Sequence, residues 1–409
     1  MQTNLADFIK GTRDGDEAEA ILRACVHCGF CTATCPTYQL LGDELDGPRG
    51  RIYLIKQVLE GAEPTRKTQL HLDRCLTCRN CETTCPSGVK YGRLVDIGRR
   101  VVEERVARPL QDRIKRTTLK EFLPRTSLFT PAFKAGQLAR PLLSRDLQDK
   151  LQPARGAGRW PTRTHARKML VLDGCVQPAM APNINAATAR VLDALGVQLI
   201  KAPKAGCCGA VRYHLNDQAG GLDDMRRNID AWWPYVEQME QVEAIVMTAS
   251  GCGVTVKEYG HLLAHDAAYA AKAQRISALT KDLSEILPPF QDELAAKLKG
   301  RIGKRVAYHP PCTLQHGQQI RGKVEGVLHA AGVDVVLCGD NHLCCGSAGT
   351  YSVLHPEIAH ELRDRKLASL AATGAEEIVS ANIGCLTHLQ SGTDTPVTHW
   401  IELLDRALA

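Results

Sequence analysis

The sequence lacks the motifs with which an enzyme subunit commonly holds a nucleotide or activates a nucleophile. No G-x-G-x-x-G follows an expected strand, so a Rossmann-type dinucleotide site is not expected. The segment from Gly317 to Lys323 matches a P-loop only as far as the lysine, because Val324 replaces the serine or threonine that would bind Mg²⁺. Neither a nucleophile elbow nor an H-E-x-x-H zinc motif is present. The chain is therefore expected to carry no flavin or nicotinamide of its own.

Long hydrophobic runs and aromatic residues are also scarce. Aromatic residues make up 5% of the chain, and no stretch approaches the ~18 uninterrupted apolar residues of a membrane-spanning helix. The amino-terminal segment MQTNLADFIKGTRDGDE contains no apolar export signal. We therefore expect a cytoplasmic protein whose thiols are kept reduced or are bound to metal.

Cysteine, by contrast, is abundant, with 17 in 409 residues. Eight of them form two copies of one pattern: three cysteines separated by two residues each, then a fourth after three more residues and directly before proline. The copies are Cys25, Cys28, Cys31, Cys35 and Cys75, Cys78, Cys81, Cys85. This is the spacing of bacterial ferredoxins that carry two [4Fe–4S] clusters, so the pattern predicts a carrier of single electrons.

The same spacing predicts which cysteines share a cluster. In two-cluster ferredoxins the fourth cysteine of each motif ligates the other cluster. We therefore expect Cys25, Cys28, Cys31 and Cys85 to hold one [4Fe–4S] cluster, and Cys75, Cys78, Cys81 and Cys35 to hold the other. Paired zinc knuckles would use only two cysteines of each motif, and disulfides do not suit a chain without an export signal.

Beyond about residue 165 the sequence contains an internal duplication. In each unit an apolar strand precedes a lone cysteine, a helix and second strand precede a cysteine pair, and a third strand precedes a last cysteine. The step from the lone cysteine to the pair is 32 residues in both units, which indicates a repeat. The first unit has Cys175, Cys207, Cys208 and Cys252, and the second has Cys312, Cys344, Cys345 and Cys385.

This alternation of strands and helices predicts an α/β layer for each unit. Residues that follow parallel strands lie beyond the carboxyl ends of the strands, where α/β sheets present their ligands. Each set of four cysteines is therefore a candidate site for a further iron–sulfur cluster or another metal. Two alternatives stay open: buried thiols that act as small hydrophobes, and thiols that cycle through a disulfide.

Other residues near the second set are weaker ligand candidates. Cys338 and His388 lie close to it in sequence and are interpreted as extra ligands or as polar neighbours. The lone histidines His309, His316 and His342 are interpreted as structural, because a lone histidine is usually a satisfied polar residue.

These features predict a multidomain protein with four segments. Residues 1–105 form a two-cluster [4Fe–4S] ferredoxin-type domain that is mostly α-helical, because 51–61 and 95–105 have helical patterns. Residues 106–165 form a basic, proline-interrupted linker with short helices. Residues 166–299 and 300–409 form the first and second cysteine-rich α/β repeats.

The formal net charge of +6 is distributed unevenly. The stretch from Arg99 to Lys168 contains 18 Lys and Arg against 6 Asp and Glu. A basic stretch of this kind indicates a solvated linker, an anionic lipid surface or an acidic protein partner. Nucleic acid is not an expected partner, because no recognised binding motif or interleaved aromatic residues accompany the charge.

The residues quoted above, together with longer blocks, resemble the iron–sulfur subunits of bacterial glycolate oxidase (glycolate dehydrogenase) and the wider family of cysteine-rich CCG repeats. The resemblance runs along nearly the whole chain. It is most specific in the blocks CVHCGFCTATCPTYQLLGDELDGPRGRIYLIKQVLEG (25–61), DRCLTCRNCETTCPSGVKYG (73–92), GCVQP (174–178), AGCCGAVRYHLN (205–216) and NIDAWWPYVE (228–237).

This resemblance implies a hetero-oligomeric enzyme. FAD-binding partner subunits would oxidise glycolate to glyoxylate, and this chain would pass the electrons toward a quinone pool at the cytoplasmic face of the inner membrane. The chain alone is then not expected to oxidise the substrate. The resemblance also allows a catalytic subunit of the heterodisulfide reductase type, or the equivalent subunit of a glycerol-3-phosphate or lactate dehydrogenase. Some relatives have C-x-x-C at the last cysteine of each repeat, whereas Cys252 and Cys385 stand alone here.

Overall fold

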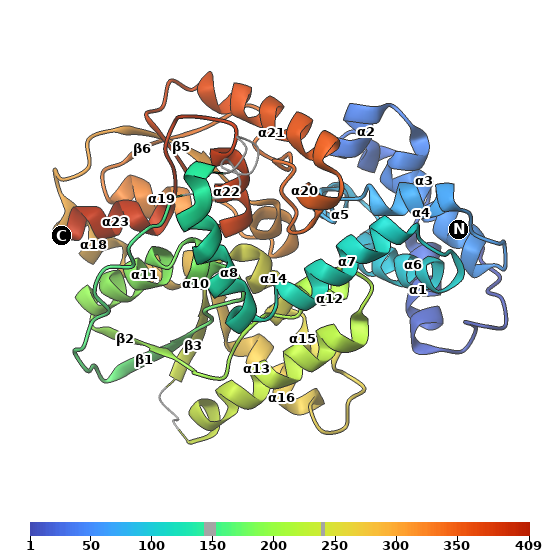
Figure 1. Ribbon diagram of the computed structural model, residues 1–409, viewed down its shortest axis with the longest axis horizontal. Coiled ribbons are helices and arrows are strands. Elements are labelled where there is room, and N and C mark those ends of the chain that lie inside the picture. Colours follow the sequence, from blue (N-terminus) through green and yellow to red (C-terminus); the bar gives the residue numbers. More distant parts are fainter. Residues whose placement is uncertain (143–152, 239–241) are drawn as a thin grey trace.

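The amino-terminal part folds into short helices whose ends are set by proline and by capping threonines. Pro36 and Pro48 stand at the first turns of two helices, and Thr12 and Thr65 cap two others through their side-chain oxygens. A computed structural model describes residues 1–142, 153–238 and 242–409 (Figure 1). The helices of this part are α1 (Arg13–Ala24), η1 (Phe30–Thr32), α2 (Pro36–Leu41), η2 (Glu44–Asp46), α3 (Pro48–Leu59), α4 (Arg66–Asp73), α5 (Asn80–Thr84) and α6 (Tyr91–Arg105).

Two of these helices, α3 and α6, correspond to the helical patterns predicted for 51–61 and 95–105, although α3 ends two residues earlier, at Leu59. They cross closely at Gly98, where a Cβ atom would lie 2.6 Å from Ile55 Cγ1. Their inner faces bury Ile52, Ile55 and Leu94 in the core of the amino-terminal part. The mostly helical fold predicted for this part is confirmed, and its core lies directly behind the ferredoxin cysteines.

The residues predicted as a linker form two helices of 13 and 14 residues. These are α7 (Leu110–Phe122) and α8 (Thr126–Ala139), followed by η3 (Arg140–Leu142). Phe129 and Phe133 of α8 stack with ring centroids 5.4 Å apart and pack against Ala179 of the first repeat. Residues 143–152 of the predicted linker lie outside the described residues. The part described is therefore fastened to the first repeat by an apolar contact.

Each repeat contains a four-stranded parallel sheet, and the two sheets have the same strand order. The first, β2-β1-β3-β4, consists of β1 (Arg167–Val171), β2 (Val197–Lys201), β3 (Val242–Met247) and β4 (Thr280–Asp282). The second, β6-β5-β7-β8, consists of β5 (Arg305–His309), β6 (Asp334–Leu337), β7 (Glu377–Ser380) and β8 (Val397–His399). Parallel strands require crossover connections, which the intervening helices supply. The predicted α/β repeats are confirmed.

The helices that cover the sheets also tie the repeats together. Those of the first repeat are α10 (Gln177–Met180), α11 (Asn183–Ala194), α12 (Ala210–His214), α13 (Gln218–Gln238), α14 (Ser250–Lys257), α15 (Tyr259–Leu262), α16 (Ala270–Leu279), α17 (Leu283–Ile286), η4 (Pro288–Phe290) and α18 (Gln291–Leu298). Those of the second are η5 (Thr313–Gly317), α19 (Lys323–Ala330), α20 (Tyr351–Leu354), α21 (Pro356–Ala371), α22 (Ile383–Gln390) and α23 (Trp400–Leu408).

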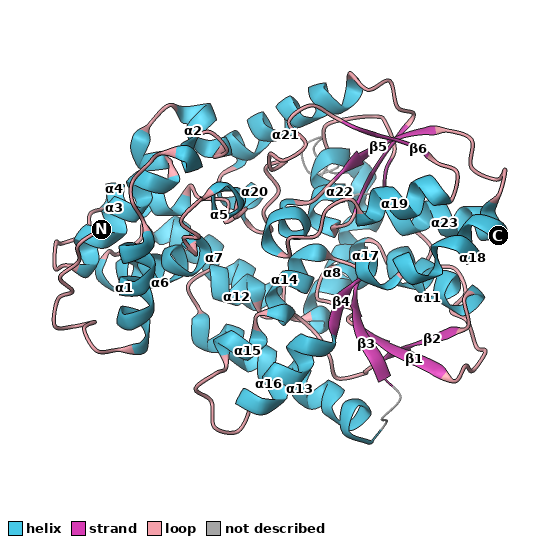
Figure 2. Cartoon of the chain, turned by 180° about the vertical axis from the view of Figure 1, so that it is seen from behind, coloured by secondary structure: helices cyan, strands magenta, loops and turns pink. Residues whose placement is uncertain are grey.

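The packing of these helices is reciprocal. Helix α11 packs on α23 of the second repeat, and α19 packs on α17 and α18 of the first. Val191 and Trp400 lie in one hydrophobic core that extends through both repeats, and an ion pair of 2.6 Å joins Arg190 to Asp405. The two repeats therefore form one body. In both views it lies at one end of the molecule, with the amino-terminal helices at the other (Figures 1 and 2).

No helix among the described residues is long and apolar enough to cross a membrane.

Candidate iron–sulfur centres

The ferredoxin cysteines line two neighbouring cavities in the amino-terminal part. The first is lined by Cys25, Cys28, Cys31 and Cys85, with Cys81 on the wall between the two cavities. The second is lined by Cys35, Cys75, Cys78 and Cys81. The fourth cysteine of each motif thus lies at the cavity of the other motif, which is the arrangement that crossed ligation requires.

Local backbone geometry produces this crossing. Cys35 is the N-cap residue of α2, and Cys85 is the C-cap residue of α5. The chain therefore changes direction at each of these cysteines, away from the other three cysteines of its motif. Gly29 has φ +87° at the start of η1, which lets the chain turn between Cys28 and Cys31. Four thiols around each cavity form a donor set that fits a [4Fe–4S] cluster.

The two cavities differ in exposure. Cys28 is exposed at the first cavity, and the side chains of Val26 and Phe30 on its rim are 67% and 61% exposed. At the second cavity Cys35, Cys75 and Cys81 are buried. Solvent exposure is one of the factors that set the potential of an iron–sulfur cluster, so the two cavities offer different electrostatic surroundings.

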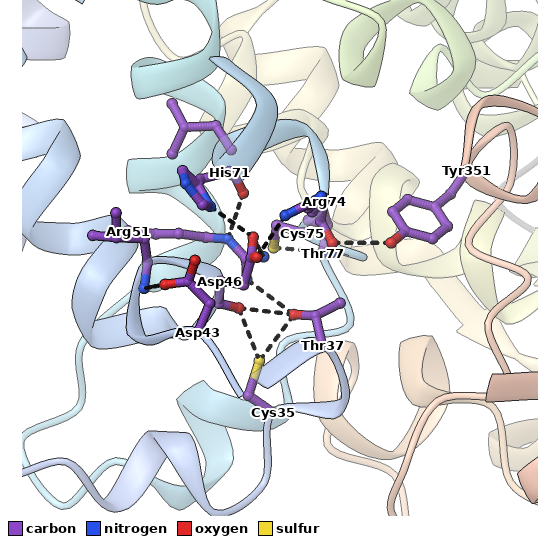
Figure 3. A network of polar contacts seen from close by, with 12 residues as sticks. Cys35, Thr37, Asp43, Asp46, Arg51, His71, Arg74, Cys75, Thr77 and Tyr351 are labelled. Carbon is purple, nitrogen blue, oxygen red and sulfur yellow. Dashed lines mark hydrogen bonds and ion pairs between the residues drawn. The ribbon is translucent and has the colours of Figure 1, made fainter. Parts of the chain in front are cut away.

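A buried polar network supports the second cavity (Figure 3). Asp46 is fully buried and receives Arg51 at 3.4 Å, Arg74 at 2.8 Å and the His71 ring at 3.0 Å. The backbone carbonyl of Asp46 accepts a 2.9 Å bond from the Thr37 hydroxyl, which lies 3.3 Å from Cys35 Sγ. Because each buried charge has a partner, the network fixes the position of Cys35 without leaving an uncompensated ion.

Hydrogen bonding and burial tune these thiols further. The backbone N–H of Thr77 donates to Cys75 Sγ at 3.4 Å, a contact that orients this sulfur atom. Burial raises the pKa of Cys31 to about 11 and that of Cys78 and Cys81 well above the ordinary range. Because a cluster is held by thiolates, a cluster at these residues would displace their protons.

The four cysteines of each repeat form a continuous row of contacting thiols. In the second repeat Cys312 Sγ lies 3.7 Å from Cys344 Sγ, and the contacts continue through Cys345 to Cys385. In the first repeat the same row runs from Cys175 through Cys207 and Cys208 to Cys252. Each row lies beyond the carboxyl ends of the strands. The structure thus brings each predicted set together.

The row depends on a glycine after each cysteine pair. Gly209 and Gly346 have φ of +92° and +90°, and a Cβ atom would lie 2.6 Å from the Gly221 carbonyl and 2.4 Å from the Ala359 carbonyl, respectively. Only glycine fits such a position. The sharp backbone turn at this glycine therefore lets both cysteines of each pair lie in the row.

One histidine that the sequence predicts to be structural, His309, lies next to the second row. His309 ends β5, is 1% exposed, and has a ring nitrogen within 4.8 Å of the sulfur atoms of Cys345 and Cys385. Both of its ring nitrogens lack a hydrogen-bond partner among the described residues. The corresponding position of the first repeat, three residues before the lone cysteine, is Leu172. The feature of the sequence that could have indicated this is the position of His309, at the end of an expected strand and three residues before the lone cysteine.

The other candidate ligands have different surroundings. His388 Nε2 lies 3.1 Å from the Ala359 carbonyl, and Cys338 packs in the apolar core shared by the repeats. The His316 ring contacts the Thr83 hydroxyl at 2.9 Å and the His342 carbonyl at 2.8 Å. These side chains therefore have structural partners and lie outside the group of close ligand atoms.

The second repeat contacts the amino-terminal part directly at the second cavity. Cys78 packs against an apolar group that contains Leu76, Cys312 and Cys344. The Tyr351 hydroxyl donates to the Arg74 carbonyl at 3.1 Å (Figure 3). The thiol row of the second repeat therefore begins against the wall of the second ferredoxin cavity.

The first repeat is fastened to the same part through charged residues. Arg79 Nη2 lies 2.9 Å from Glu258 Oε2 in a two-pronged ion pair, and the His214 ring lies 3.3 Å from Asp96. Cys208 packs instead in an apolar core made of residues of its own repeat.

Comparison with known proteins gives the same division of the chain. A 4Fe-4S dicluster domain model matches residues 21–89, and a cysteine-rich domain model matches 169–257 and 306–390. The chain is 56% identical over its whole length to the glycolate oxidase iron–sulfur subunit of Escherichia coli K12, covering 99% of it. It is 30% identical to a probable glycolate oxidase iron–sulfur subunit of Bacillus subtilis over 93% of this chain and 90% of that one. Lactate utilization protein A of Bacillus licheniformis is 28% identical over 53% of this chain and 87% of its own length.

A helical two-cluster ferredoxin part joined to two cysteine-rich α/β repeats defines an iron–sulfur electron-transfer protein. The similarity of this chain to known proteins along nearly its whole length identifies a family within this class. The chain belongs to the family of glycolate oxidase iron–sulfur subunits, and its role lies in an oxidoreductase complex.

Proposed function

We propose that this chain is the electron-transfer subunit of a glycolate-oxidising complex and that its partners bind FAD. Two observations support glycolate: two relatives that align along nearly the whole chain are named as a glycolate oxidase iron–sulfur subunit and a probable one, and the sequence similarity extends over all parts of the chain. The flavin must reside on partner chains, because this sequence has no nucleotide-binding motif and substrate oxidation needs a cofactor that accepts a hydride or its equivalent.

The eight ferredoxin cysteines are the proposed cluster ligands. Cys25, Cys28, Cys31 and Cys85 would hold one [4Fe–4S] cluster, and Cys75, Cys78, Cys81 and Cys35 the other. The observation that carries this proposal is the lining of the two cavities, where each fourth cysteine faces the opposite motif. When bound, the clusters supply one-electron transfer between partners.

The exposure of the first cavity gives the proposed side of electron entry. Val26 and Phe30 place apolar surface on its rim, next to the exposed Cys28. Apolar residues around a redox centre suit a partner that must approach closely and exclude water. We propose that the flavin-bearing subunit docks there, and that the buried second cavity lies further along the path.

We propose a quinone as the electron acceptor and peripheral contact with an anionic membrane at the cytoplasmic face. Leu110 and Ile114 of α7 are exposed beside the exposed cations Arg113 and Lys115, a combination that suits a lipid interface. Part of the basic excess serves another purpose, because Arg108 pairs with Asp73 at 2.6 Å. The proposed membrane contact is thus confined to the exposed part of α7 and its surroundings.

The eight repeat cysteines are proposed as further metal ligands, as Cys312, Cys344, Cys345 and Cys385 in one site and Cys175, Cys207, Cys208 and Cys252 in the other. Their mutual contacts support this reading. A disulfide-cleaving role is disfavoured, because the hydrogen bond to the Cys344 thiol and burial raise the pKa of Cys312. A raised pKa leaves little of the thiolate that would act as the nucleophile. The segments 1–105, 106–165, 166–299 and 300–409 are the proposed domains.

Anaerobic purification of the full chain tests this function. We expect at least about eight iron atoms, of which eight come from the two cubane clusters, and no oxidation of glycolate by the chain alone. Addition of the flavin-bearing partners should reduce the clusters when glycolate is supplied. Turnover by the isolated chain, or clusters that stay oxidised in the reconstituted complex, would contradict the proposal.

A further inference from the structure

The second repeat contains a buried histidine whose surroundings offer no hydrogen bond. His309 is 1% exposed, and neither ring nitrogen has a hydrogen-bond partner among the described residues. Leaving a buried polar atom without a hydrogen bond is unfavourable, because the atom has lost its contact with water and gained no partner in return. An apolar residue at this position would avoid that cost, and the first repeat has one, Leu172, which is 3% exposed.

The nearest chemically relevant neighbours of His309 are sulfur atoms. One ring nitrogen and the sulfur atoms of Cys345 and Cys385 lie within 4.8 Å of one another, and all three residues are buried. A neutral imidazole and thiolates are the donor set that iron and zinc share. Asn382 Nδ2 approaches Cys385 Sγ at 3.6 Å, the kind of contact that orients a ligating sulfur.

We propose that His309 is a metal ligand and that it completes, with Cys345 and Cys385, a mixed histidine–cysteine site for a thiophilic transition metal, iron or zinc. This inference rests on the proposed metal-binding role of the second row and adds a nitrogen donor to it. The first repeat cannot form such a site, because Leu172 has no donor atom. The two repeats would then differ in chemistry although they share their four cysteines.

A set of three variants tests the proposal in the full-length chain. His309→Leu installs the residue of the first repeat, and His309→Cys replaces the nitrogen donor with a sulfur donor. His388→Leu is the matched control, because His388 is a buried histidine of the same repeat that lies 3.1 Å from the Ala359 carbonyl. Iron and zinc per chain are measured after anaerobic purification, and the ferredoxin iron of each variant shows that it has folded.

The spectroscopic readout depends on which metal is found. For zinc, X-ray absorption should show a nitrogen ligand at ~2.0–2.1 Å beside sulfur at ~2.3 Å. For iron, pulsed paramagnetic resonance should show a coupling to directly bound nitrogen that changes when histidine is labelled with ¹⁵N. The proposed ferredoxin ligands are all thiolates, so they contribute no such coupling.

We expect the wild-type chain to bind metal beyond the ferredoxin iron. His309→Leu should weaken this binding by at least ~10–100-fold, His309→Cys should keep the metal without the nitrogen signal, and His388→Leu should retain both. Wild-type protein with no metal beyond the ferredoxin iron would overturn the proposal. So would a His309→Leu variant with wild-type metal content and spectrum. Absence of the ferredoxin iron itself would instead count against the proposed function.

Discussion

The two cysteine-rich repeats are built on one plan but differ in what surrounds their thiols. Both have a four-stranded parallel sheet of the same order, a row of four cysteines and a glycine at φ close to +90°. Three residues before the lone cysteine, however, the first repeat has Leu172 and the second has His309. The row of the second repeat touches Cys78 of the ferredoxin part, whereas Cys208 of the first packs among residues of its own repeat.

The backbone determines the positions of the thiols in both repeats, and the side chains determine what surrounds them. Strand order and the glycine turn position the thiols, so the two rows share a shape. Single side chains three residues before the lone cysteine and at the junction then determine which donor atoms and which neighbours surround each row. The duplicated backbone thus gives two rows of the same shape. In the second repeat a polar residue, His309, lies beside the row, and the row also contacts the second ferredoxin cavity.

The largest expected effect tests whether the two rows are equivalent. Gly209→Ala and Gly346→Ala each force a Cβ atom against a backbone carbonyl and impose a strained positive φ. We expect each to lower the free energy of unfolding by about 3–5 kcal/mol, from overpacking and from the left-handed conformation. Urea unfolding of both holo-proteins measures this. A large effect in only one repeat would show that the rows are not equivalent.

The next effect concerns the charged junction of the first repeat. Arg79→Met removes the two-pronged pair and leaves Glu258 unpaired, where the two side chains are 13% and 25% exposed. We expect a loss of about 2–3 kcal/mol, measured as a lower urea midpoint. Arg79→Lys keeps the charge and is the matched control, with a smaller loss. Equal stability of Arg79→Met and wild type would mean that this junction depends on other contacts.

Acidification should weaken the junction of the second repeat. Burial lowers the pKa of His316 to about 4, below the ~6.5 of an exposed histidine, so the folded protein keeps the ring neutral while the unfolded chain binds a proton. Stability from this group is complete above pH ~6.5 and falls as the pH decreases toward 4, by about 2 kcal/mol at pH 5. Arg321 lies 3.4 Å from His316 Nδ1, the nitrogen that also contacts the Thr83 hydroxyl. Its positive charge further disfavours a protonated ring and so lowers the pKa of His316.

Thermal unfolding at pH 7 and pH 5 measures this effect. His316→Gln, which cannot titrate, should show a smaller difference between the two pH values than wild type. The same difference in both proteins would assign the pH dependence to other groups, such as His355, whose pKa burial also lowers to about 4.

The smallest expected effect is at Cys338, which has no counterpart in the first repeat. Its side chain is buried in the shared apolar core, away from the thiol row. Cys338→Ala should therefore cost about 1 kcal/mol of stability through lost packing and leave the metal content unchanged. Loss of metal from this variant would instead place Cys338 among the metal ligands of the second repeat.

Much of this architecture could be predicted from residue spacing. The two ferredoxin motifs, the repeat with its 32-residue step and the alternation of strands and helices are local patterns, and local patterns determine local structure. The sequence also indicated helices in the segment after residue 106. Their docking through Phe129 and Phe133 depends on a surface formed by distant residues, so no local pattern reports it.

The same reason explains what was missed at the site. The sequence predicts a structural role for His309, because nothing in the adjacent residues shows that its ring lacks hydrogen-bond partners. The approach of Cys78 to Cys312 and Cys344 joins residues more than two hundred positions apart and depends on how the domains pack. Contacts of this kind follow from tertiary packing, which spacing alone does not specify.

The central claim is that two [4Fe–4S] clusters are held by crossed sets of cysteines, and the paramagnetic resonance spectrum of the reduced full-length chain tests it most directly. Cys28→Ser and Cys78→Ser identify the signals of the first and second cavities. We expect Cys85→Ser to alter the same signal as Cys28→Ser, although Cys85 belongs to the motif of Cys78. A Cys85→Ser spectrum that instead matches Cys78→Ser, or a wild-type chain that contains zinc in place of iron at these cavities, would contradict it.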